Sequence, residues 1–175
     1  MPTVRSLYIL RHAKSSWDNP GQEDHARPLA PRGRRAVAVL AEHIRTHEIR
    51  PELVLCSTSR RTIETLEGVA PSGEALIERS LYTASCEELI ERLRRLPPAT
   101  GSAMVVGHNP TLQMVVLKLA RSAAPSAPIS AIEEIRRKYP TGALAVLNFT
   151  CEWAQLGCGA AELADYVRPK ALAYQ

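Results

Sequence analysis

Aromatic residues are scarce in this chain of 175 residues: they make up 5% of it, with a single phenylalanine and two tryptophans. Lysine and arginine exceed aspartate and glutamate, which gives a formal net charge of +4 and an isoelectric point near 9.0. Surfaces that bind nucleic acid usually combine clustered basic residues with aromatic side chains that stack on bases. The arginines here are scattered and form no such cluster. We therefore expect no nucleic-acid partner, and the excess positive charge favours an anionic substrate.

Metal-binding patterns are also missing. The four cysteines form no CxxC pair and have no histidine pattern beside them, so we expect reduced thiols in a cytosolic protein rather than a zinc site. His43 and His47 have a spacing of four residues, which can bind a metal on a helix. No acidic third ligand accompanies them, so we expect two surface histidines. The sequence predicts no metal and no other cofactor.

Long apolar runs are absent as well. No stretch approaches the roughly 18 or more apolar residues that a membrane helix needs. The first apolar run ends at Arg11, too soon for a secretory signal. We expect a soluble, cytoplasmic protein without a membrane partner. Residues 121–130 are the most linker-like stretch but are too short to separate two domains, so we expect a surface loop there and a single domain over residues 1–175.

Short apolar runs alternate with helical patterns along the chain. Strands are predicted at 7–10, 53–56, 75–77, 103–106 and 143–150. Helices are predicted to begin near Pro31, after Thr62, near Ser85 and after Pro110. The alternation predicts an α/β fold, a three-layer sandwich with a mostly parallel central sheet and helices on both faces. The residues from Trp153 onward are not placed by this pattern.

Three of the predicted strands end in polar clusters. Arg11 and His12 follow the first, residues 57–62 follow the second, and residues 107–109 (Gly-His-Asn) follow the fourth. Because the carboxyl ends of parallel strands share one edge, these clusters should converge there. Arginines and histidines gathered at one edge suit phosphoryl transfer without a metal: one imidazole can attack phosphorus and the other can serve as a charged donor. For either histidine taken alone, a hydrogen bond to a loop is the favoured interpretation.

Four ordered motifs resemble those of the histidine phosphatase superfamily, the phosphoglycerate-mutase-like enzymes. The first, Leu10-Arg11-His12-Ala13, resembles the R-H-G/A signature. The others are Arg27-Pro28-Leu29 with Gly33, Ser57-x-x-x-Arg61-x-x-x-Thr65, and Gly107-His108-Asn109-Pro110. The short chain, the run from Asp24 to Leu29, the run from Leu81 to Ser85 and the Pro140-Thr141-Gly142 turn look like the SixA-type phosphohistidine phosphatases. The resemblance spans about residues 5–150.

The resemblance implies roles for individual residues. His12 would be the phosphorylated nucleophile, and Arg11, Arg61 and His108 would complete the phosphate pocket. Ser57 and Asn109 would support substrate binding. Arg27, in the loop over the pocket, is either a fourth cation of the site or a structural residue of the loop.

A general acid is the missing element. Larger superfamily members supply a glutamate, often just after the first signature, whereas Lys14 follows Ala13 here. Expulsion of an alkoxide is slow without a positioned acid, and an imidazole leaves with less help. This favours a phosphatase acting on a phosphohistidine-bearing signalling or phosphocarrier protein through phospho-His12. The alternatives are a phosphatase for small phosphomonoesters with the same mechanism, and a non-catalytic module that binds phosphate or protein.

Overall fold

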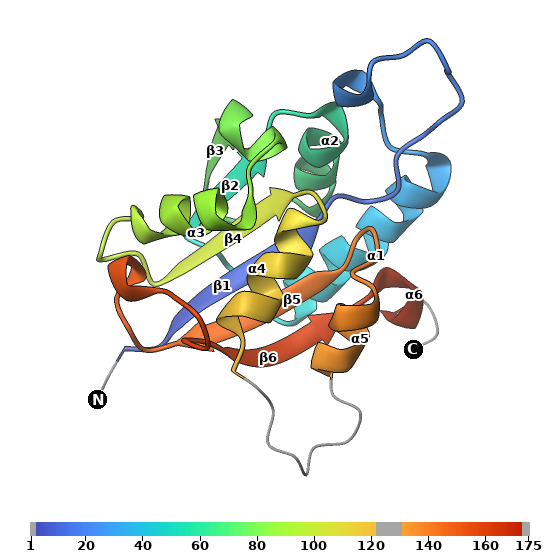
Figure 1. Cartoon of the computed structure of the whole chain (residues 1–175). Helices are drawn as coiled ribbons and strands as arrows, with labels where there is room; N and C mark the ends of the chain where they lie inside the picture. The colour runs from blue at the N-terminus through green and yellow to red at the C-terminus, as the bar shows by residue number, and fades with distance from the viewer. Residues whose placement is uncertain (1–2, 122–130, 173–175) are drawn as a thin grey trace.

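The computed structural model describes residues 3–121 and 131–172 (Figure 1). A six-stranded sheet in the order β3-β2-β4-β1-β5-β6 forms its centre. The strands are β1 (Arg5–Arg11), β2 (Leu53–Ser57), β3 (Glu74–Glu78), β4 (Ser102–Gly107), β5 (Leu144–Phe149) and β6 (Glu162–Val167). The first four are mutually parallel, whereas β5 runs antiparallel to both of its neighbours.

Helices cover both faces of the sheet, as the sequence predicts. They are α1 (Pro31–Thr46), α2 (Arg60–Val69), α3 (Cys86–Arg94), α4 (Thr111–Leu119), α5 (Ala131–Arg137) and α6 (Pro169–Leu172). Strand side chains alternate between two apolar clusters: Val105 packs with α3, α4 and α5, and Met104 with α1 and α2. This alternation follows from the two-residue period of a strand, and it confirms the three-layer sandwich.

One strand, one helix and one histidine differ from the sequence prediction or extend it. The edge strand β6 lies in the tail that the apolar pattern did not place, and α5 lies in a stretch for which no element was predicted. The loop expected at residues 121–130 lies, apart from Arg121, outside the described residues. His43 is not a surface residue: it is only 8% exposed, with its ring stacked on that of His47 at 3.9 Å between centroids.

The sheet order brings the three polar strand ends together. β2, β4 and β1 are consecutive neighbours, and Arg11 at the end of β1 pairs with Gly107 at the end of β4. The His12 amide donates to the Gly107 carbonyl at 3.1 Å, and the Gly142 amide donates to the carbonyls of Arg11 and His12. The backbone around His12 is therefore fixed on one side by the end of β4 and on the other by the turn that precedes β5.

The loop of residues 13–30 follows β1, and its last residues are hydrogen-bonded to its first residues. The Ala30 amide donates to the Lys14 carbonyl and the Ser16 amide to the Pro28 carbonyl, each at 2.8 Å. Gly33, in the first turn of α1, packs directly on this loop: a Cβ there would overlap the Lys14 carbonyl oxygen. The glycine thus allows α1 to approach the backbone that follows His12.

Gly33→Ala should destabilise the fold by about 1–3 kcal/mol, because the Lys14 backbone must shift to make room. Urea denaturation measures this change. Gly157→Ala is the matched control, since a Cβ at Gly157 meets its neighbours at 3.6 Å or more. Equal stability of the two variants would contradict the close approach of α1 to the loop.

Candidate active site

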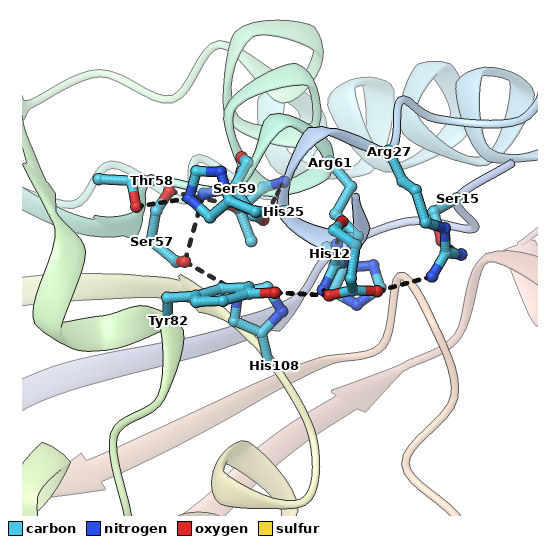
Figure 2. Close-up of polar contacts among 12 residues, drawn as sticks. His12, Ser15, His25, Arg27, Ser57, Thr58, Ser59, Arg61, Tyr82 and His108 are labelled. Atoms are coloured by element: carbon cyan, nitrogen blue, oxygen red, sulfur yellow. Dashed lines mark hydrogen bonds and ion pairs between the residues drawn. The ribbon is translucent and has the colours of Figure 1, made fainter. Parts of the chain in front are cut away.

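A pocket of about 440 Å³ opens where β1, β2 and β4 end. Six of its lining side chains come from the predicted set: Arg11, His12, Arg27, Arg61, His108 and Asn109. The others are Lys14, Ser15, Trp17, Asp24, Tyr82, Thr83 and Thr141. In Figure 2, Arg61 of α2 lies above His12, and the ring of Tyr82 lies beside that of His108.

The His12 ring is held in one tautomer. Its Nδ1 lies 2.8 Å from the Ala13 carbonyl oxygen, which can only accept a hydrogen bond, so Nδ1 carries the proton. Nε2 is then the nitrogen with the free lone pair. Burial is the main cause that lowers the pKa of His12 to about 3, with smaller contributions from His108, Arg61 and Arg11. His12 is therefore neutral near pH 7, the state in which an imidazole can act as a nucleophile.

His108 lies beside His12, with 5.3 Å between ring centroids. Its Nε2 is 2.8 Å from Ser57 Oγ, and its buried Nδ1 has no hydrogen-bond partner among the described residues. Burial, followed by the charge of Arg61, lowers the pKa of His108 to about 4. In this structure His108 is thus a neutral ring rather than the charged donor considered from the sequence. A bound anion would act against that shift.

Positive charge in the pocket comes from Arg11 and Arg61, together with Lys14 and Arg27. Arg11 Nη1 donates to the Tyr139 carbonyl at 2.7 Å, while its buried Nε has no partner among the described residues. Burial and the nearby Arg61 lower the pKa of Arg11. Arg61 donates from Nη1 to the Asp24 carbonyl at 2.6 Å and from Nη2 to Asp24 Oδ2 at 3.0 Å. The arrangement concentrates donors for an anion with several oxygens.

Asp24 is the single carboxylate among the described residues that line the pocket. Its Oδ2 also accepts from the Tyr82 hydroxyl at 2.6 Å, and its Oδ1 accepts from Arg27 Nη1 at 2.8 Å. The hydrogen bond from Tyr82 is the largest cause that lowers the pKa of Asp24 to about 2, and Arg61 and Arg27 add to it. Asp24 is therefore ionised throughout the neutral range and holds no proton to donate.

Comparison with known proteins identifies the family. Residues 7–82 match the model of the histidine phosphatase superfamily (branch 1). An uncharacterized protein of Mycobacterium tuberculosis is 34% identical over 161 residues, covering 92% of this chain and all of that protein. A structure from Nakamurella multipartitia, of a candidate phosphohistidine phosphatase SixA, has 32% identity and a TM-score of 0.85, covering 97% of this chain and 99% of that one. The chain belongs to the histidine phosphatase superfamily.

Within that superfamily the chain is a phosphatase of the SixA type. The structure of the protein histidine phosphatase SixA complexed with tungstate has the same fold, with a TM-score of 0.76 at 21% identity over 95% of this chain. The described residues contain no group of three or more side chains suited to hold a metal ion. No helix in the described part of the chain is long and apolar enough to cross a membrane.

Asn109, Ser57 and Arg27 were predicted as substrate-binding residues, and the structure places them differently relative to the pocket. Asn109 lines the pocket and donates to the Tyr139 carbonyl at 3.1 Å. Ser57 is fully buried behind His108 and does not line the pocket, so we expect it to act through that ring. Arg27 lines the pocket, but its guanidinium is already bound to Ser16, Asp24 and Ser15.

The sequence did not assign roles to Asp24, Tyr82 or Trp17. Asp24 stands three residues before Arg27, a separation that permits their ion pair but does not require it. Tyr82 is 58 residues away from Asp24 in the chain, so no local pattern indicates their hydrogen bond. Trp17 is 69% exposed and its ring lies over the Arg27 guanidinium, 3.2 Å from centroid to Cζ. These contacts arise only when the loop folds over the strand ends.

Stability should fall as the pH is lowered from 6.5 to about 4.5. The folded-state pKa values of His12 and His108 lie below the ordinary value of 6.5, so the unfolded chain binds more protons in this interval. His12 alone should contribute a loss on the order of 2 kcal/mol. Urea denaturation of wild type and His12→Gln at both pH values measures it. The variant should lose less stability than the control His47→Gln; an equal loss would contradict a buried neutral His12.

Proposed function

We propose that this phosphatase hydrolyses phosphohistidine on a signalling or phosphocarrier protein through a covalent phospho-His12 intermediate. The observation that carries the proposal is the state of His12. Its Nδ1 proton is committed to the Ala13 carbonyl, and its neutral ring lies among Arg11, Arg61 and His108. A neutral imidazole with one available nitrogen beside two guanidinium groups supports nucleophilic attack on an anionic phosphoryl group.

In the first step of this proposal, His12 Nε2 forms a bond to phosphorus as the bond to the leaving group breaks. The His12 ring keeps its Nδ1 proton and becomes a positively charged phosphoimidazolium, which the Ala13 carbonyl stabilises. Arg11 and Arg61 would bind the phosphoryl oxygens, whose charge is spread in the transition state. In the second step, water attacks phosphorus as the bond to His12 Nε2 breaks; the protons of the water leave on the phosphate product, and His12 departs in its original neutral tautomer. No metal is needed in either step.

The protonation state of Asp24 supports a leaving group that departs easily. An ester of an ordinary alcohol needs a proton donor for its leaving oxygen. Asp24 is ionised, and no other carboxyl group is among the described pocket residues. The imidazole of phosphohistidine can leave as a neutral ring, so it suits this pocket better than an alkyl phosphate does.

The mouth of the pocket supports a substrate carried on a protein. Trp17 and Asp24 at the mouth are exposed, whereas His12 and Arg61 at the base are buried. A histidine side chain can therefore present its phosphoryl group to the base while the rest of its protein stays outside. The resemblance to the SixA candidate from Nakamurella multipartitia points to the same class of substrate.

Replacing His12 with alanine should lower turnover of a phosphohistidine-bearing carrier protein by more than about 10³-fold, because the covalent step disappears. The assay follows loss of the phosphoryl group in the presence of a chelator. His47→Ala, at the exposed residue that caps the C-terminus of α1, should retain wild-type turnover. Similar activity of His12→Ala and His47→Ala would refute the assignment of His12 as the nucleophile.

The substrate class is tested by comparing kcat/KM for the phosphohistidine carrier with that for 4-nitrophenyl phosphate in wild-type enzyme. We expect a clear preference for the carrier, and inhibition of both reactions by vanadate. A preference for the ester would support the alternative, a small-molecule phosphatase with the same mechanism. No turnover of either substrate would favour a non-catalytic binding module.

A further inference from the structure

The carboxylate of Asp24 occupies a distinctive place between the base and the mouth of the pocket. Its side chain is 53% exposed, whereas that of Arg61, to which it is paired, is 8% exposed. Three side chains hold it: Tyr82 and Arg61 at Oδ2, and Arg27 at Oδ1. It is thus a fixed negative charge with one side open to solvent, at the rim of a pocket that otherwise favours anions.

A phosphoryl group bound at the base directs its leaving group toward this carboxylate. His12 and Arg61 are buried at the base, so the phosphoryl oxygens lie there. In-line displacement places the leaving group on the side of phosphorus opposite to the His12 nitrogen, toward the mouth. Asp24 and Trp17 are exposed lining residues of the pocket and so lie toward this mouth, and Tyr82 is hydrogen-bonded to Asp24.

The geometry points to Asp24 as a specificity-determining residue: its carboxylate accepts a hydrogen bond from the protonated ring nitrogen of the substrate phosphoimidazole and so selects phosphohistidine over phosphate esters. This inference rests on the proposed function. A carboxylate offers about four lone-pair positions, and three side-chain donors are bound here. Oδ1, with Arg27 as its single side-chain donor among the described residues, retains room for a further donor.

The proposed contact assists the reaction without moving a proton. Phosphohistidine leaves readily when the nitrogen that does not carry phosphorus is protonated, and a neighbouring carboxylate favours that charged form of the ring. As the phosphorus–nitrogen bond breaks, its electron pair returns to the ring. The ring departs as neutral imidazole and keeps its remaining proton, which is the one bound to Asp24. The phosphoryl group passes to His12 Nε2, so atoms and charges balance.

The same carboxylate disfavours esters. An aryl or alkyl phosphate presents an oxygen that gains negative charge as it leaves, and a fixed anion beside it opposes that change. Asp24 therefore acts in opposite directions on the two substrate classes. A residue that served only to position Arg61 and Arg27 would affect both classes alike.

The test compares Asp24→Asn with wild type. We expect kcat/KM for a phosphohistidine carrier protein to fall about tenfold or more, while kcat/KM for 4-nitrophenyl phosphate is unchanged or rises. Glu23→Gln is the matched control: it removes one negative charge from the neighbouring exposed residue, whose side chain has no hydrogen bond to the pocket, and should leave the ratio unchanged. Competitive inhibition by inorganic phosphate, measured in all three proteins, reports whether Arg61 still binds an anion.

A changed ratio with phosphate inhibition within about threefold of wild type would support the inference. A parallel loss on both substrates, or no change on either, would overturn it and leave Asp24 as a structural partner of the arginines. Failure of wild-type enzyme to hydrolyse the phosphohistidine carrier would instead contradict the proposed function itself. The two failures are therefore separable within one experiment.

Discussion

The confinement of two guanidinium groups at the end of the sheet, that of Arg61 buried and that of Arg11 partly buried, is the constraint on which the rest of the site depends. Burial, followed by the charge of Arg61, lowers the pKa of Arg11 and of His108, as expected for charged groups close together in a poorly solvated space. Such an arrangement is unfavourable unless each cation has fixed partners. The Tyr139 carbonyl supplies one for Arg11, and Asp24 supplies two acceptors for Arg61.

Those partners come from distant parts of the chain, so the site forms only with the complete fold. Tyr139 is fully buried; its hydroxyl donates to the Ile9 carbonyl at 2.6 Å, and its own carbonyl accepts from Arg11 and Asn109. One residue therefore links the middle of β1, the end of β1 and the start of α4. Because these contacts are made within the protein, the donors are in place before an anion arrives, which is the condition for electrostatic catalysis without reorganisation.

The parts of this site that can be predicted from the sequence are those marked by a few neighbouring residues. A short apolar strand followed by Arg11 and His12, or by His108, can be recognised from a few neighbouring residues, and parallel strands guarantee that such ends converge. The direction of β5 could not be recognised in this way, since an alternating apolar pattern is the same in both directions along a strand. The contact of Asp24 with Tyr82 depends on how the loop folds, and His43 is buried by packing that its own helix does not specify.

The proposed reaction requires little acid–base chemistry, which is consistent with the neutral state of both histidines. Phosphoryl transfer from a substrate imidazole to His12 exchanges one phosphorus–nitrogen bond for another, and each ring keeps the proton on its other nitrogen. The Ala13 carbonyl fixes that proton on His12, and Asp24 stands where it would do the same for the substrate ring. Hydrolysis of the intermediate then releases His12 in the tautomer in which it began. Because a loose transition state asks little of the attacking water, the pocket can use its polar groups to bind the phosphoryl oxygens.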